Sequence, residues 1–243
     1  NVFYTLKNNT QIMNEPIESF DLNFVNNAAN DCPSISFLNI EIEGEIKEYK
    51  PYLSNYFKDM GINKNNFFTD VSNYLAYEVG QPTHCYDFSK LDEPIEFNKI
   101  EKDFEFKTLL GKKINLTGKN CVFISNGQVI NLAGVMGGIA TACDKNTKNV
   151  LVECAYFRPE AIIGKTVKYD INSDAAYKFE RGVDPDMQEF SLRRFIQIVD
   201  DHSQIKRLGL YRNKFADIPS KKINSLLSNF FNNQSGMLAQ AGI

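Results

Sequence analysis

The sequence predicts a mixed α+β fold, in which antiparallel-rich, layered sheets are flanked by helices. Residues 94–131 alternate apolar and polar side chains with period two, and Gly, Asp or Asn separates the short runs. Amphipathic segments with helical spacing lie on both sides of this block. The chain has 243 residues, of which 43% are hydrophobic and 12% aromatic, enough to fill a sizeable core.

Charge and composition exclude several classes of protein. The net charge is −3, from 27 basic and 30 acidic side chains, so no overall field favours nucleic acid or membranes and any RNA contact must be local. Apolar runs are shorter than the roughly 18 residues of a membrane span, and the first residues do not resemble a signal peptide. Five scattered cysteines and two histidines argue against a zinc site and a disulfide framework. We therefore expect a cytoplasmic protein without a metal site or membrane contact.

The N-terminal third begins with little pattern. A short strand is predicted at 2–6, and residues 1–30 are assigned to a preceding region, because a chain that opens without Met on a polar run suggests an excised fragment. Residues 35–43 form a strand in which Ile40 and Ile42 alternate with polar side chains. We place one domain at 31–212, and a linker with the start of a further domain and a partly disordered tail at 213–243.

Two helices follow this strand. Pro51 opens the first, and Gly61 lies just past its end. The second is predicted over residues 70–79, with Thr69 or Asp70 as its N-cap and Gly80 closing it.

The period-two block then predicts a meandering antiparallel sheet. Its clearest part is a hairpin with Asn126-Gly127 in a type I′ turn, since these residue types adopt positive φ most easily. The remaining predicted elements are a buried strand at 149–157, a helix from 159 to about 167, a short helix capped by Ser173, a helix starting at Asp184-Pro185, a strand over 205–212 and a final helix capped by Ser220.

Phosphate-binding loops, zincin motifs and a serine nucleophile elbow do not occur in the sequence. His84, predicted on a turn, is either a turn residue bonded to backbone or a group that positions water. Glu153 lies in an apolar strand, where a carboxylate is costly unless it is paired. It is therefore either in a salt bridge, with Arg158 or Arg181, or an acceptor for a ligand's hydroxyl or amine.

The last two candidates are a glycine pair and a serine. Gly137-Gly138 is either a tight turn or bulge, or a place where a substrate lies against backbone N–H groups. Ser173 precedes Asp-Ala-Ala and is either an N-cap, the simpler role, or a catalytic residue whose hydroxyl orients a water.

These features, in this order, resemble one family, the β subunit of bacterial phenylalanyl-tRNA synthetase in its B3/B4 domain. The matching text is DVSNYLAYEVGQPTHCYD at 70–87, MGG at 136–138, NVLVECAYF at 149–157 and SDAAYKFERGVDP at 173–185. The resemblance implies an editing site that hydrolyses tyrosine wrongly esterified to the phenylalanine tRNA. It also implies two partners, the acceptor end of that tRNA and the synthetase α subunit. ATP and Mg²⁺ are expected for the full synthetase, and no cofactor within these residues.

By the same resemblance, Glu153 matches the acceptor for the tyrosine phenol and His84 the histidine near the scissile ester. Ser173 stands where the family has threonine, and Ala175 matches the small residue that leaves room for the substrate. Gly137 and Gly138 would lie beside the substrate.

The sequence also departs from the family pattern. Thr141-Ala142 replaces a second glycine pair, so by the resemblance Thr141 would lie at the substrate and its Cβ would crowd the pocket. The basic run before Ser173 is Val-Lys-Tyr-Asp, and Tyr177 stands where many members have histidine. The alternative interpretation is therefore the same domain with a degenerate pocket, retained as a structural or tRNA-positioning part of the synthetase.

Overall fold

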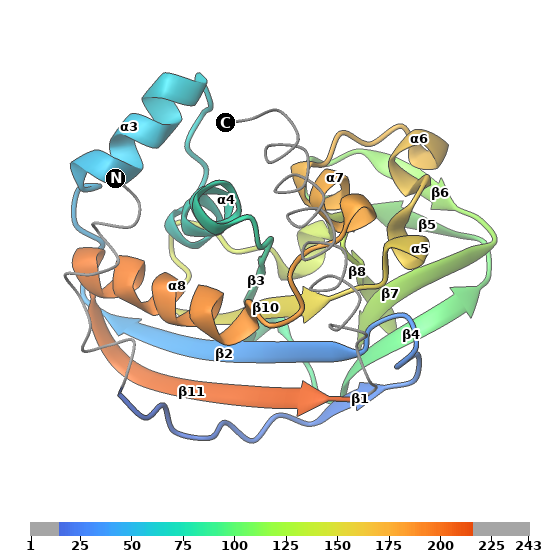
Figure 1. Cartoon of the computed structure of the whole chain (residues 1–243), viewed down its shortest axis with the longest axis horizontal. Helices are drawn as coiled ribbons and strands as arrows, with labels where there is room; N and C mark the ends of the chain where they lie inside the picture. The colour runs from blue at the N-terminus through green and yellow to red at the C-terminus, as the bar shows by residue number, and fades with distance from the viewer. Residues whose placement is uncertain (1–14, 216–243) are drawn as a thin grey trace, which may run out of the picture.

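The computed structural model describes residues 15–215 and has the predicted fold class (Figure 1). A four-stranded antiparallel sheet has the order β11-β2-β10-β3, with bounds Gln204–Lys214, Ser34–Glu43, Asn149–Tyr156 and His84–Asp87. A five-stranded sheet has the order β1-β4-β7-β8-β9, with bounds Phe24–Asn26, Ile95–Glu101, Lys119–Ser125, Gln128–Leu132 and Met136–Gly137. In it only β1 pairs in parallel, with β4. A separate hairpin joins β5 (Phe104–Lys107) to β6 (Lys113–Leu116).

Six α-helices surround these sheets in the described part of the chain. The long α8 lies along the four-stranded sheet beside α4, while α5, α6 and α7 lie at the other end of the molecule, near β7 and β8 (Figure 1). Their bounds are Pro51–Met60 for α3, Phe67–Val79 for α4, Pro159–Ile162 for α5, Lys165–Tyr169 for α6, Asp174–Arg181 for α7 and Gln188–His202 for α8.

The four-stranded sheet separates two hydrophobic cores, because alternate side chains of a strand point to opposite faces. Val150, Val152 and Cys154 of β10 pack with the α3, α4 and α8 side. Leu151 and Ala155 face the five-stranded sheet instead. Glu153 is in phase with these two residues, so the alternation directs its carboxylate into the space between the sheets.

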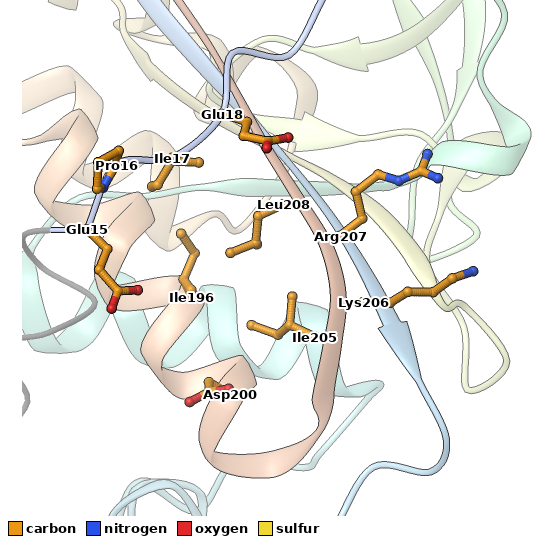
Figure 2. A pocket seen from close by; sticks show the side chains of 10 residues that line it. All are labelled: Glu15, Pro16, Ile17, Glu18, Ile196, Asp200, Ile205, Lys206, Arg207 and Leu208. Atoms are coloured by element: carbon orange, nitrogen blue, oxygen red, sulfur yellow. The ribbon is translucent and has the colours of Figure 1, made fainter.

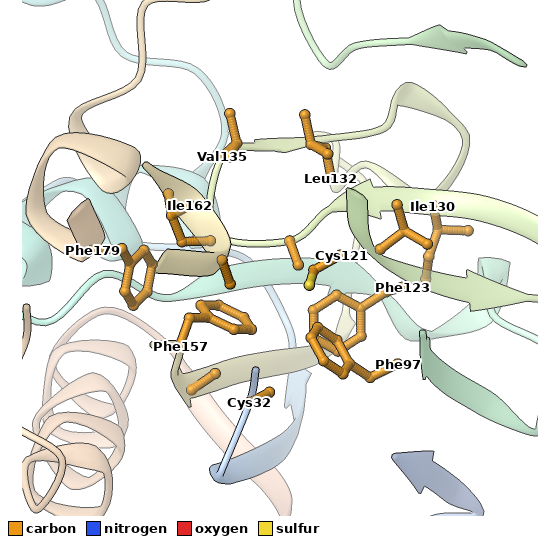
Figure 3. Packing of buried hydrophobic residues seen from close by; sticks show 14 of the residues in the cluster. Cys32, Phe97, Cys121, Phe123, Ile130, Leu132, Val135, Phe157, Ile162 and Phe179 are labelled. Carbon is orange, nitrogen blue, oxygen red and sulfur yellow. The ribbon is translucent and has the colours of Figure 1, made fainter. Parts of the chain in front are cut away.

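Phenylalanine rings pack together in that space with aliphatic side chains (Figure 3). The rings of Phe97 and Phe157 stack with centroids 5.8 Å apart, and Phe123 contacts both. Phe179 of α7 packs edge-on against Phe157 at 5.1 Å, which ties this helix to the core. The surroundings of Glu153 are therefore largely apolar.

Several sequence predictions are confirmed. The first helix spans Pro51–Met60, with Gly61 in the left-handed region as its C-cap. Asn126 and Gly127 have φ values of 48° and 68°, as a type I′ turn requires. Ser173 caps α7 by accepting the Ala176 N–H at 3.1 Å.

Other boundaries differ from the predictions. Helix α4 begins three residues early at Phe67, because the Asn66 side chain accepts the Thr69 N–H and acts as the N-cap. The segment from 159 to 169 forms two short helices separated by Gly164, which has φ +78°.

Helix α8 starts at Gln188, since the Asp184-Pro185 segment forms a turn instead. The predicted strand at 2–6 and the helix capped by Ser220 lie outside the described residues.

Candidate functional site

Glu153 and His84 lie directly opposite each other on β10 and β3. Residues paired across antiparallel strands point to the same face, so both side chains enter the space between the sheets. The predicted turn position of His84 is therefore wrong, because this residue is the first of strand β3. The strand pairing brings the two most reactive predicted side chains together.

The partners of Glu153 are two polar side chains, not the arginines that a salt bridge would need. Tyr86 donates its phenol proton to Oε2 at 2.6 Å, and the amide of Asn131 donates to the same oxygen at 3.3 Å. That amide also donates to the Tyr86 oxygen at 2.8 Å, which closes a buried three-membered cluster. Among the described residues, no hydrogen bond reaches Oε1.

Arg158 and Arg181 are engaged elsewhere. Arg158 donates to the Asn30 carbonyl at 2.7 Å, and the Arg181 guanidinium lies 3.5 Å from the ring centre of Tyr177. The predicted salt bridge is therefore wrong.

Sequence reasoning missed Tyr86 and Asn131. With 84–87 interpreted as a turn, nothing indicated that Tyr86 shares a face with His84. In a strand, the two-residue spacing would have predicted it.

The imidazole of His84 packs closely against neighbouring side chains. Its ring packs edge-on against Tyr86, with centroids 4.4 Å apart. Its buried Nε2 has no hydrogen-bond partner among the described residues. Burial in this apolar setting lowers the pKa of His84 to about 4, so the ring is neutral near pH 7. A neutral ring with an unpaired nitrogen can accept a proton or a hydrogen bond.

Burial acts on Glu153 in the opposite direction. The residue is 4% exposed, and desolvation raises the pKa of its carboxyl group to about 8. The hydrogen bonds from Tyr86 and Asn131 offset part of this effect, because they stabilise the charged form. Glu153 thus titrates close to neutral pH and presents an acid or a carboxylate according to conditions.

A small pocket opens at these two side chains. Its volume is about 50 Å³, compared with about 30 Å³ for one water molecule in the liquid. Strand β3 and the residues before it supply three wall residues, β8 and β10 supply one each, and the loop after β8, strand β9 and helix α7 supply two each. In this order they are Pro82, Thr83, His84, Asn131, Glu153, Gly134, Val135, Met136, Gly137, Ala175 and Phe179. In this conformation the pocket holds water-sized groups, and a tyrosine ring requires its walls to separate.

Gly137 is required by the position of His84. A Cβ on Gly137 would lie 2.2 Å from Cε1 of the imidazole, far inside the normal contact distance. Gly138 has a different role, because its N–H donates to the Ile130 carbonyl at 2.8 Å, and an added Cβ would meet that carbonyl oxygen at 2.7 Å. Gly137 lies in β9, and Gly138 follows it in extended conformation with φ −88° and ψ 153°, so the predicted tight turn is wrong.

The other predicted site residues divide between the pocket and its supports. Ala175 lines the pocket. The Ser173 hydroxyl donates to the Val135 carbonyl at 2.6 Å while it caps α7. These two hydrogen bonds join the helix to the pocket wall at Val135. Thr141 is 3% exposed, lies outside the pocket lining, and its Oγ1 has no hydrogen-bond partner among the described residues.

A larger hollow of about 640 Å³ lies elsewhere, between residues 15–18, α8 and β11 (Figure 2). Its floor is apolar, with Ile196, Ile205 and Leu208, and its rim carries side chains of both charges. The buried polar groups that favour chemistry are at the small pocket instead. Within residues 15–215, no group of three or more His, Cys, Asp or Glu side chains could hold a metal, and no helix is long and apolar enough to span a membrane.

Comparison with known proteins gives consistent relatives. The chain is 35% identical over 141 residues to the phenylalanine–tRNA ligase beta subunit of Photorhabdus laumondii, covering 58% of this chain and 18% of that protein. It is 29% identical over 187 residues to the corresponding subunit of Neisseria meningitidis serogroup A, covering 69% of this chain and 24% of that protein. The chain therefore spans a quarter or less of the length of these relatives.

Among solved structures, an N-terminal fragment of the phenylalanyl-tRNA synthetase beta subunit from Pyrococcus horikoshii matches with a TM-score of 0.46 and 12% identity, over 83% of this chain and 56% of that one. The sequence profile of the B3/4 domain matches residues 32–204, which is more than half of the chain. This chain belongs to the B3/4 domain family.

Proposed function

We propose that this domain hydrolyses tyrosine wrongly esterified to the phenylalanine tRNA, as part of a phenylalanine–tRNA ligase beta subunit. The observation that carries the proposal is the pairing of Glu153 with His84 in one pocket, a buried acceptor beside a neutral imidazole. The relatives' shared identity as phenylalanine–tRNA ligase beta subunits supports it.

The selectivity of such a site follows from the chemistry of Glu153. A synthetic site that is shaped for phenylalanine rejects an added hydroxyl only weakly, whereas a buried polar group that needs a partner rejects the side chain without one. An incoming phenol would donate to the carboxyl oxygen of Glu153 that faces the pocket. A phenylalanine ring would leave that oxygen unpaired in an apolar setting, which costs about 1–3 kcal/mol or more.

Hydrolysis would proceed by attack of water on the ester carbonyl. A water hydrogen-bonded to Nε2 of His84 adds to the carbonyl carbon and loses a proton, the bond to the ribose oxygen breaks, and that oxygen takes up a proton. The products are tyrosine and tRNA with a free terminal hydroxyl. With a pKa of about 4, His84 is a weak base, so positioning of the water contributes more than its deprotonation. Ser173 would support the pocket wall through Val135.

The proposal includes a cellular setting and partners. The acceptor end of the tRNA must reach the pocket, and the synthetase α subunit would carry the aminoacylation site, with its ATP and Mg²⁺, in the cytoplasm. The hydrolysis itself requires neither a nucleotide nor a metal.

A second function is favoured by two observations. The phenol of Tyr86 already occupies Glu153, and the pocket volume is about 50 Å³. Under this alternative the pocket is degenerate, and the domain serves as a structural or tRNA-positioning part of the synthetase.

The deciding experiment measures tyrosine release from tyrosine-charged phenylalanine tRNA by the full-length synthetase. We expect release above the buffer rate, and its loss when His84→Ala and Glu153→Ala are combined. Glu105→Ala, at an exposed position of β5, is the matched control and retains the rate. Release at the buffer rate by the unmodified enzyme contradicts the editing function and favours the structural one.

A further inference from the structure

Tyr86 approaches Glu153 from the core, not from the pocket. Its side chain is fully buried, and it is absent from the pocket lining to which Glu153, His84 and Asn131 contribute. Its position two residues after His84 on β3 gives both side chains the same face of the sheet. The phenol therefore contacts the carboxyl group from the side of the hydrophobic core, while the pocket gives access to the carboxyl group from the other side.

The hydrogen bond from Tyr86 is chemically the same bond that an incoming tyrosine side chain would make. The phenol donates to Oε2 at 2.6 Å, a short distance that is typical of strong O–H···O⁻ bonds. Asn131 orients it, because the amide N–H groups donate to the phenol oxygen and direct the phenol proton toward Glu153. The protein thus carries its own phenol on the acceptor that would recognise a substrate phenol.

We propose that Tyr86 is a specificity-determining residue, whose phenol satisfies Glu153 within the fold and so weakens the preference of the pocket for hydroxylated over plain aromatic side chains. This inference rests on the proposed function, since it concerns how the same pocket selects tyrosine.

The physical argument concerns what is left unpaired when a plain phenyl ring enters. Discrimination in such a site comes from the penalty of a buried polar group without a partner. With Tyr86 in place, the carboxyl group keeps a strong hydrogen bond whichever ring is bound. Without the Tyr86 hydroxyl, Glu153 retains only the 3.3 Å bond from Asn131, and an incoming phenol becomes its principal donor.

The test is the substitution Tyr86→Phe, which removes one oxygen and retains the ring that packs against His84. The intact protein is titrated with p-cresol and with toluene, the side-chain analogues of tyrosine and phenylalanine, and binding is followed by NMR. The two probes are nearly equal in size, so the cost of widening the pocket largely cancels in the ratio of their dissociation constants. We expect a modest preference for p-cresol in the wild type and a preference about tenfold larger in Tyr86→Phe.

Two further variants complete the design. Tyr74→Phe removes another buried phenol that donates to a carboxylate, Glu78 at 2.9 Å, in the other core, and leaves the ratio at the wild-type value. At pH 9, where Glu153 is ionised, adding Glu153→Gln to Tyr86→Phe removes the charge of the acceptor and reduces the preference again.

An unchanged ratio in Tyr86→Phe overturns the inference, and so does the absence of p-cresol binding by that variant. Hydrolysis of mischarged tRNA is measured in a separate assay, so a failure of the editing proposal can be distinguished from a failure of the proposal for Tyr86. A p-cresol preference gained by Tyr86→Phe without any tyrosine release supports the role of Tyr86 and contradicts editing. Tyrosine release together with an unchanged ratio does the reverse.

Discussion

Replacing Glu153 by glutamine tests the electrostatics of the pocket without any ligand. Glutamine has nearly the same shape and can accept from Tyr86 and Asn131, but it does not ionise. Because burial raises the pKa of Glu153 to about 8, from 4.5 in the unfolded chain, the folded state binds its proton more tightly than the unfolded state. The contribution of this proton is therefore fully present below pH 4.5 and is lost as pH rises through 8.

The size of the effect follows from these values. Between pH 4.5 and 8 the folded protein holds one more proton than the unfolded chain at this site, so each pH unit lowers the free energy of unfolding by about 1.4 kcal/mol. His84 acts in the opposite sense, because its lowered pKa of about 4 costs stability as pH falls from 6.5 through 4. Above pH 6.5 only Glu153 of this pair contributes, and the loss up to pH 9 amounts to about 2 kcal/mol.

The assay is urea denaturation of the wild type and Glu153→Gln at several pH values from 6.5 to 9, with the free energy of unfolding extrapolated to water. The difference between the two proteins should shift by about 2 kcal/mol in favour of glutamine as pH rises. Glu105→Gln, whose side chain is 57% exposed, controls for loss of a carboxylate and should run parallel to the wild type. Parallel curves for wild type and Glu153→Gln would refute the burial argument.

Three further predictions concern the geometry of the pocket and core. Gly137→Ala displaces the His84 ring, so the imidazole NMR signal should titrate at a higher pKa than about 4, whereas Gly209→Ala, which crowds Phe20 instead, should leave it unchanged. Ser173→Ala removes both the cap of α7 and the bond to the pocket wall, and urea denaturation should show a loss of about 1–2 kcal/mol. The five cysteines are all buried, so a thiol reagent should label none of them until urea unfolds the chain, and rapid labelling in native buffer would contradict this packing.

Much of the fold could be predicted from local chemistry. Apolar alternation, the Asn126-Gly127 turn and the Pro51 and Gly61 ends of α3 are signals within a few residues of the structure they specify. The predicted start of α4 was three residues too late for an equally local reason. Asn66 caps the helix, and Phe67 and Phe68 open it. Asparagine is at least as good an N-cap as threonine, so the sequence is compatible with a helix start before Phe67 as well as with one at Thr69.

The site was harder to predict, because it depends on pairing between distant strands. Glu153 was identified as anomalous within its own strand, but its partners come from β3 and β8, which sequence spacing alone does not connect to β10. The proposed arginine partners were near in sequence, and proximity along the chain is a poor guide to contacts across a sheet. The hydroxyl of Tyr86 carried no signal until His84 was placed in a strand.

The same register that builds the pocket also places an internal phenol against its acceptor, Glu153. Because β3 and β10 pair at Glu153 and His84, any residue two positions after His84 must point to the same face as the carboxylate. A phenylalanine there would only pack, whereas Tyr86 packs and donates. The hydroxyl oxygen of Tyr86 therefore decides whether Glu153 has a strong hydrogen-bond donor within the fold or depends on a ligand for one. The comparison of wild type with Tyr86→Phe measures that difference directly.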